Sequence, residues 1–165
     1  MREPVAILGV GQLGGIFGQG LLRLGVPVVP FLRDDSLEKL AAMEPRLVLL
    51  AVGEKDLGAA LEALPVSLRD RVALVQNELR AGDAERFGLE SPTIAVVWFE
   101  KKRGRAARVV RTTRIGGPHS ALLRRALEAV DLPARVIDAR DLPFELVRKN
   151  VYILASNVAG LAVGG

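Results

Sequence analysis

The first half of the chain alternates short, continuous apolar runs with polar and glycine-rich stretches. Four runs have the length of strands: Val5–Leu8, Val26–Leu32, Leu47–Val52 and Val72–Val75. Runs without polar alternation are typical of strands buried on both faces, so they predict a parallel sheet. Capping and stop signals predict helices between them: Gly14–Leu24 closed by Gly25, a short helix from Asp35-Ser36-Leu37-Glu38 to Pro45, and one from Asp56 to Leu64.

The alternation of strands and helices changes after residue 90. Thr93–Phe99 and Arg108–Thr113 are predicted to form an antiparallel pair around a basic turn. The remaining expected elements follow Gly116-Gly117-Pro118: a helix from Ser120 to Val130, a strand at Arg135–Asp138, and a final helix from about Pro143, capped by Asp141. The pattern predicts one α/β domain with a parallel sheet, an antiparallel hairpin extension and a long terminal helix.

Composition narrows the classes of function. The 165 residues are 50% hydrophobic and 25% charged, as expected of a globular domain, and contain no cysteine, which excludes disulfides and thiolate chemistry and fits a cytoplasmic location. The net charge of +4 comes mostly from residues 101–114, where no aromatic residues interleave, so we expect a solvated surface and no nucleic-acid partner. The apolar run 151–165 is too short to span a bilayer, so no membrane partner is expected.

The most specific motif is a strand that runs directly into G-x-G-x-x-G and then into a helix. In such a motif Gly9 permits a tight turn, Gly11 lets the backbone approach a pyrophosphate, and Gly14 lets helix and strand pack closely. The helix N-terminus adds free N–H groups that attract phosphate. We therefore predict a Rossmann-type dinucleotide-binding domain over residues 1–140, with the cofactor bound by Gly9, Val10, Gly11, Gln12, Leu13 and Gly14.

Two further residues at strand ends are predicted to contact the cofactor. Arg33 follows the second strand, where a guanidinium binds the 2′-phosphate of NADP. If that strand runs one residue longer, Asp34 takes the position and favours NAD instead. Asn77 follows the fourth strand, so it is expected at the ligand edge of the sheet.

The final helix carries a second candidate site. Lys149 and Asn157 lie eight residues apart, about two turns along one helical face, and an amine in a partly buried groove can donate a proton to a carbonyl. The alternative is a surface lysine whose stem packs on the protein and an amide at a helix interface. The helix also has more apolar surface than a small domain covers, so we expect a homo-oligomer, a dimer in the simplest case, through residues 143–165.

In these positions the chain resembles the ketopantoate reductase family over nearly its whole length. The matching segments are the Gly9/Gly11/Gly14 turn, Phe31-Leu32-Arg33, Val75-Gln76-Asn77, Ile115-Gly116-Gly117-Pro118 and Leu146–Leu161. The resemblance implies that NADPH delivers hydride to a small 2-keto acid while Lys149 acts as general acid. It also implies that Arg33 binds the NADP phosphate, and that Asn77 and Asn157 contact the substrate.

The chain departs from the family pattern at several places. Glu78 stands where glycine is usual, Gly53 where lysine is frequent, Ile153 at a second helix asparagine, and Val96-Val97-Trp98-Phe99 in place of a small polar run. The sequence ends early in the family's helical C-terminal domain, so residues 141–165 are expected to form either its first helix or a dimerisation helix. Two alternatives remain: a non-catalytic NAD(P)-binding module that oligomerises through that helix, and another Rossmann dehydrogenase, since Gly11-Gln12-Leu13-Gly14-Gly15 also resembles prephenate dehydrogenases.

Overall fold

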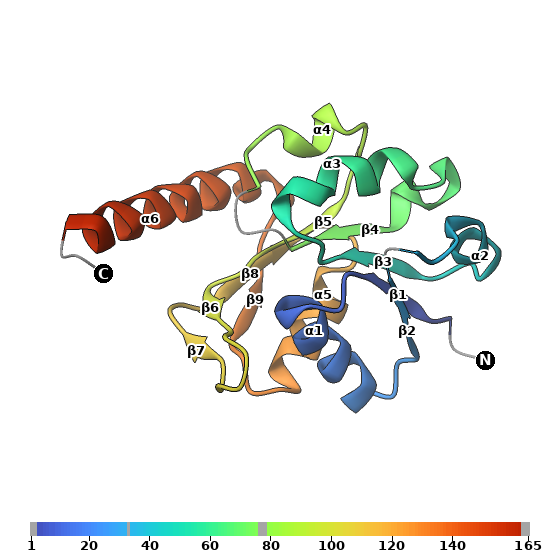
Figure 1. The fold of residues 1–165 in the computed structure, drawn as a ribbon, viewed down its shortest axis with the longest axis horizontal. Helices are drawn as coiled ribbons and strands as arrows, with labels where there is room; N and C mark the ends of the chain where they lie inside the picture. The colour runs from blue at the N-terminus through green and yellow to red at the C-terminus, as the bar shows by residue number, and fades with distance from the viewer. Residues whose placement is uncertain (1–2, 33, 76–78, 163–165) are drawn as a thin grey trace.

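The computed structural model describes residues 3–32, 34–75 and 79–162, and its centre is a seven-stranded sheet (Figure 1). The strand order is β2-β1-β3-β4-β5-β8-β9. The strands are β1 (Val5–Leu8), β2 (Val28–Phe31), β3 (Leu47–Leu50), β4 (Val72–Leu74), β5 (Thr93–Val96), β8 (Thr113–Gly116) and β9 (Ala134–Val136). The first five are parallel, β8 runs antiparallel to β5, and β9 is parallel to β8. The predicted α/β fold with a largely parallel sheet is confirmed.

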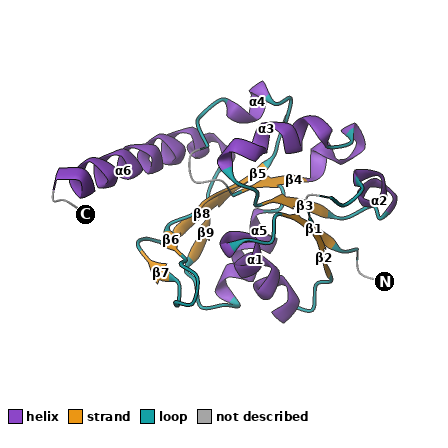
Figure 2. Ribbon diagram, in the orientation of Figure 1, coloured by secondary structure: helices purple, strands orange, loops and turns teal. Residues whose placement is uncertain are grey.

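Helices cover both faces of the sheet, and the last helix extends beyond it (Figures 1 and 2). One face carries α1 (Gln12–Arg23) and α5 (Ser120–Glu128). The other carries α2 (Leu37–Ala42), α3 (Glu54–Ala63), the 3-10 helix η1 (Val66–Arg71), α4 (Asp83–Arg86) and the start of α6 (Leu142–Ala162), which follows the 3-10 helix η2 (Ala139–Asp141). A two-stranded hairpin, β6 (Phe99–Glu100) with β7 (Arg108–Val109), is the predicted antiparallel extension.

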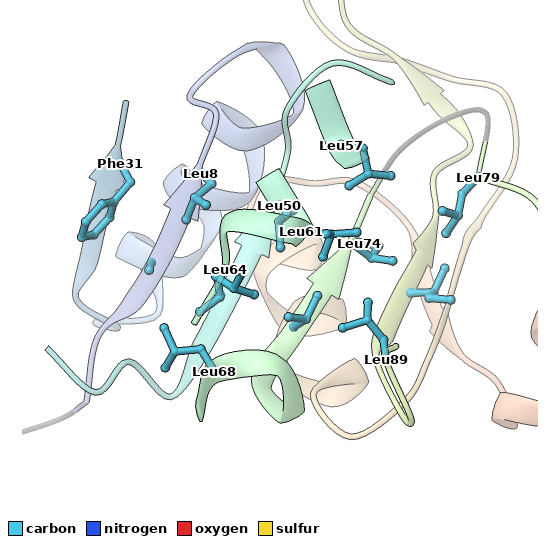
Figure 3. Close-up of a cluster of buried hydrophobic side chains, with 14 of the residues drawn as sticks. Leu8, Phe31, Leu50, Leu57, Leu61, Leu64, Leu68, Leu74, Leu79 and Leu89 are labelled. Carbon is cyan, nitrogen blue, oxygen red and sulfur yellow. The ribbon is translucent and has the colours of Figure 1, made fainter. Parts of the chain in front are cut away.

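Two apolar layers hold this arrangement together, because the side chains of each strand point alternately to opposite faces. In β3, Val48 and Leu50 belong to the layer under α3, while Leu47 and Leu49 belong to the layer under α1 and α5. Figure 3 shows the first layer, with leucines of α3 packed over the ends of β1, β3 and β4. The runs that form β1, β3 and β4 are therefore buried on both faces, as predicted, whereas β2 lies at the edge of the sheet and is only partly buried.

Several predicted boundaries were wrong. The segment Thr93–Phe99 is not one strand but contains β5 and the first residue of β6, and Arg108–Thr113 contains β7 and only the first residue of β8. The break occurs because the carbonyl oxygen of Trp98 accepts hydrogen bonds from both Val110 N and Arg111 N, so the ladder cannot continue regularly. Asp138 is the N-cap of the 3-10 helix η2, since its side chain accepts from Arg140 N, and Asp141 directly precedes α6 as expected.

The third helix begins earlier than predicted, and the final helix begins where it was expected. α3 starts at Glu54, with Gly53 as its N-cap, so Asp56 lies in the first turn instead of capping it. α6 begins at Leu142, close to the expected Pro143, and the division of the chain at residue 140 stays a prediction. None of the helices in the described ranges combines the length and apolarity that crossing a membrane requires.

Candidate functional site

The turn between β1 and α1 is built so that two of its positions accept only glycine. Gly9 has a φ of 90°, and a Cβ there would lie 2.7 Å from the carbonyl oxygen of Ala51. A Cβ at Gly14 would lie 2.1 Å from the carbonyl oxygen of Gly9, so the first turn of α1 contacts the strand end directly. Gly11 is different, because a Cβ there would meet no protein atom within 4 Å. The chain thus keeps open space in front of Gly11.

A cavity of about 560 Å³ lies beside this turn, at the carboxyl ends of β1, β2 and β3. Gly9 and Gly11 line it, together with residues of the β2–α2 turn and of the start of α3. Gly11 is the N-cap of α1 without a side-chain capping bond, and the first turn of α1 carries no acidic residue. Backbone N–H groups at an uncapped helix N-terminus favour phosphate, and the volume lies within the range of about 300–1,000 Å³ typical of ligand pockets. These residues fit a dinucleotide pyrophosphate and adenosine.

The other predicted glycine-motif residues are placed differently. Val10 is half-exposed and, with Gly14, lines a separate apolar groove of about 620 Å³ between α1 and β2. Gln12 is exposed at the first position of α1, and Leu13 packs partly into the core layer under that helix. Of the six predicted residues, only Gly9 and Gly11 line the cavity at the strand ends.

The side of the cavity formed by the β2–α2 turn contains an acidic residue that the sequence analysis did not select. Asp35 lines the cavity, and its Oδ2 accepts a hydrogen bond of 2.6 Å from Leu32 N, which fixes the turn after β2. A carboxylate at this position accepts ribose hydroxyls and repels a 2′-phosphate. The acidic pair Asp34-Asp35 was the signal for it, although only Asp34 was weighed. Arg33 and Asn77, the predicted NADP and ligand contacts, lie outside the described residues.

Lys149 is buried, so the structure does not support the alternative of a surface lysine. Its side chain is 8% exposed, and its Nζ lies 4.8 Å from the ring centroid of Trp98 and 5.8 Å from that of Tyr152. Burial lowers the pKa of Lys149 from its ordinary value, and the charge of Glu100 opposes this shift. A lysine in such surroundings is a better proton donor than one in water.

Asn157 does not share this environment. It is exposed and lines a groove of about 760 Å³ between α6 and the segment that carries α3 and α4, and Lys149 is not among the described residues that line this groove. The expectation that both side chains would face one groove is therefore wrong. A step of eight residues leaves the two positions about 80° apart around a helix of 3.6 residues per turn. Lys149 therefore contacts Trp98, while Asn157 lines the groove.

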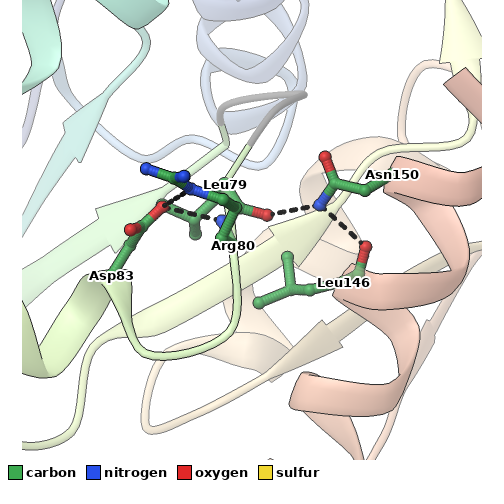
Figure 4. A network of polar contacts seen from close by, with 5 residues as sticks. All are labelled: Leu79, Arg80, Asp83, Leu146 and Asn150. Atoms are coloured by element: carbon green, nitrogen blue, oxygen red, sulfur yellow. Dashed lines mark hydrogen bonds and ion pairs between the residues drawn. The ribbon is translucent and has the colours of Figure 1, made fainter. Parts of the chain in front are cut away.

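Asn150 anchors the final helix to the ligand edge of the sheet, which the sequence analysis missed. Its Nδ2 donates hydrogen bonds of 3.0 Å to the carbonyl oxygens of Leu79 and Leu146 (Figure 4). Leu79 comes two residues after Asn77, in the segment that follows β4. The next turn is closed by Asp83, whose Oδ2 accepts from Arg80 N at 2.8 Å. Asn150 thus joins the turn of α6 that carries Lys149 to the segment that follows β4.

The chain has no match among protein-family models or curated proteins, but solved structures share its fold. A putative F420-dependent NADP-reductase from Arthrobacter sp. FB24 is 17% identical, with a TM-score of 0.65 over 96% of this chain and 95% of that one. The 2-dehydropantoate 2-reductase from Methylococcus capsulatus is 16% identical, with a TM-score of 0.68 over 98% of this chain and 65% of that one. An imine reductase from Streptomyces aurantiacus is 17% identical, with a TM-score of 0.58 over 97% and 64%.

At these identities the likeness concerns the fold. The chain spans slightly less than two thirds of the 2-dehydropantoate 2-reductase and of the imine reductase, and nearly the whole of the NADP-reductase.

Proposed function

We propose that this chain binds NADPH and serves as the nucleotide-binding domain of a reductase that acts on a small 2-keto acid. The observation that carries the proposal is the Gly9–Gly14 turn, whose open position at Gly11 faces a cavity of about 560 Å³ at the carboxyl ends of the parallel strands. Similar folds carry the names of an NADP-reductase, a 2-dehydropantoate 2-reductase and imine reductases, which supports the choice of cofactor and reaction.

Each part of the cofactor has a proposed position on the chain. The N-terminus of α1 and the backbone of Gly11 hold the pyrophosphate, because the space in front of Gly11 is open. Gly9 shapes the turn, and its N–H donates a hydrogen bond to the carbonyl oxygen of Phe31. The adenosine lies in the cavity, with its ribose near Asp35. Arg33 binds the 2′-phosphate of NADP, opposing the repulsion from Asp35. When bound, NADPH supplies the hydride for the reaction.

Lys149 is proposed as the proton donor for the substrate carbonyl. Its ammonium is held at the ligand edge by α6 and Asn150, and burial brings its pKa closer to that of a group that exchanges protons near neutrality. Asn77 and Asn157 are proposed to contact the substrate. Asn157 lines the groove between α6 and α3, so in this proposal the substrate extends into that groove.

The proposed reaction is tested by following NADPH absorbance with a panel of 2-keto acids, for the wild-type chain and for Lys149→Ala. We expect the wild type to oxidise NADPH and Lys149→Ala to lose turnover. The NADPH affinity of Lys149→Ala should be nearly the same as that of the wild type. NADPH binding without turnover by any acid favours the non-catalytic binding module. Oxidation of prephenate with reduction of a nicotinamide dinucleotide favours the alternative dehydrogenase.

We also propose that the chain forms a homodimer through α6. Five apolar side chains on this helix are between 54% and 66% exposed: Phe144, Val147, Val151, Leu154 and Val158. Their spacing alternates between three and four residues, which is the a/d pattern of a coiled coil. The outer part of α6 extends from the sheet (Figure 1), and an isolated helix of this length is marginal in water. A second copy of α6 would cover the same face on both chains, as a two-fold interface requires.

The dimer is tested with a matched pair of substitutions on α6. Leu154→Glu places a charge in the apolar seam, while Ser156→Glu adds the same charge two residues away, at a heptad position opposite the seam. Sedimentation should give a dimer for the wild type and Ser156→Glu, and a monomer for Leu154→Glu. A wild-type chain that sediments as a monomer with an intact helix contradicts the proposal.

A further inference from the structure

Trp98 occupies the ligand edge of the sheet, two residues beyond the end of β5, and is 1% exposed. Its backbone is fixed on both sides: Trp98 N donates to Thr113 Oγ1 at 3.1 Å, and its carbonyl oxygen accepts from Val110 N at 2.8 Å and from Arg111 N at 3.0 Å. The indole is therefore held in place by the sheet and the hairpin, independently of any ligand. No role beyond core packing follows from this placement alone.

The indole belongs to the apolar layer under α3 and α6, but three cations also lie close to its ring. The Nζ of Lys149 lies 4.8 Å from the ring centroid, and the guanidinium carbons of Arg111 and Arg148 each lie 5.7 Å from it. The ring of Tyr152 lies 5.2 Å away at an interplanar angle of 58°. All three cations are within the distance of about 6 Å at which the negative face of an aromatic ring attracts a positive charge.

Lys149 depends on these rings more than the two arginines do. Arg148 has a carboxylate partner, since its Nη1 lies 3.2 Å from Glu145 Oε1, and Arg111 is exposed to water. Within the described part of the chain, Lys149 Nζ has no hydrogen-bond acceptor, and Glu100 acts on it only through its charge. Among the described residues, the faces of Trp98 and Tyr152 are therefore the contacts that stabilise the ammonium directly.

We propose that Trp98 is a positioning residue for Lys149: with Tyr152 it forms an aromatic cage that holds the ammonium at the ligand edge of the sheet. The cage favours the charged form and restricts the direction in which the amine points. This inference rests on the proposed role of Lys149 as proton donor and extends it, because a caged ammonium remains a proton donor in spite of its burial. Trp98 and Tyr152 act through Lys149 and not on the substrate.

The test is the titration of Lys149 itself, followed by NMR of chain labelled at the lysine Cε and assigned with Lys149→Met. Trp98→Leu keeps the site apolar but removes the aromatic face, so the pKa of Lys149 should fall by about half a pH unit or more. Trp98→Phe retains a ring and should give a pKa between the two. Arg148→Met removes a neighbouring positive charge and should raise the pKa of Lys149. A pKa in folded Trp98→Leu that equals or exceeds the wild-type value overturns the proposal.

A second measurement needs no change at Trp98 and so does not depend on the folding of that variant. Trp98 is the single tryptophan of the chain, so its emission reports its own surroundings. The emission of the wild-type chain should change with pH as Lys149 titrates, and this step should disappear in Lys149→Met, which retains Tyr152, Glu100, Glu145 and both arginines. Identical pH profiles in the two proteins overturn the cage.

Neither measurement uses NADPH or substrate, so a failure of the cage is distinguished from a failure of the proposed reduction. If the chain turns over, the pH–rate profile adds a functional readout: the alkaline limb should move to lower pH in Trp98→Leu and partly return in Trp98→Phe. A purely structural role for Trp98 would lower the rate equally at every pH.

Discussion

Alanine substitutions at Gly11 and Gly15 separate the binding role of the glycine turn from its structural role. At both positions a Cβ would meet no protein atom within 4 Å, so neither substitution creates a clash. Gly11 is the N-cap of α1, where alanine in place of glycine costs about 1 kcal/mol. Gly15 is inside α1, where alanine is more favourable than glycine by about 0.8–1 kcal/mol. The free energy of unfolding should therefore fall slightly for Gly11→Ala and rise for Gly15→Ala.

Cofactor affinity should change in Gly11→Ala and not in Gly15→Ala. Gly11 lines the cavity of about 560 Å³, so its new methyl group would stand where a pyrophosphate approaches, whereas Gly15 lines the separate groove between α1 and β2. We expect Gly11→Ala to weaken NADPH binding tenfold or more, which corresponds to about 1.4 kcal/mol or more, and Gly15→Ala to leave it unchanged. Denaturant unfolding and calorimetric titration measure the two effects. Equal NADPH affinity in folded Gly11→Ala and wild type would refute the assignment of the turn.

Three further predictions concern the other residues of the site. Asp35→Asn removes a negative charge from the ribose end of the cavity, so NADPH affinity should rise relative to NADH affinity. Arg33→Gln should lower the affinity for NADPH and not for NADH. Titrations of each variant with both dinucleotides measure these changes. Asn150→Ala loses the bonds to Leu79 and Leu146 and should lower the free energy of unfolding by about 1 kcal/mol, against a change within about 0.5 kcal/mol for exposed Asn157→Ala. Because burial lowers the pKa of Lys149 in the folded chain, the unfolded chain binds more protons between that pKa and 10.5. The free energy of unfolding should therefore rise with pH in this window. Lys149→Met should not show this rise.

The glycine turn and the parallel strands were predictable because both leave a local signature. The run Val5–Leu8 must be apolar to be buried on two faces. Gly9 and Gly14 are required because a Cβ there would lie 2.7 and 2.1 Å from a backbone carbonyl oxygen. The apolar run and the close approach of Gly14 to Gly9 involve neighbouring residues, so the sequence alone predicts them, whereas the approach of Gly9 to Ala51 exists only in the folded sheet. The division of Thr93–Phe99 into two strands depends instead on the hydrogen bonds that Trp98 accepts from residues 110 and 111, which only the folded hairpin brings together.

The site beyond the turn was harder to predict for the same reason. The sequence places Lys149 and Asn157 on one helix, but their surroundings depend on which neighbours pack against it. Lys149 contacts Trp98, which lies 51 residues earlier by numbering, while Asn157 remains exposed on a groove shared with α3 and α4. Asp35 was missed because its position depends on the turn after β2. The Asp35 carboxylate accepts from Leu32 N in that turn, and several other turn geometries would also allow this bond.

The most direct test of the central claim is a calorimetric titration of the purified chain with NADPH and, separately, with NADH. The account predicts tight binding of NADPH at one site per chain and distinctly weaker binding of NADH. Absence of heat with both dinucleotides, from a chain whose fold is confirmed by its cooperative unfolding, would contradict the claim that the Gly9–Gly14 turn and its cavity form a cofactor site.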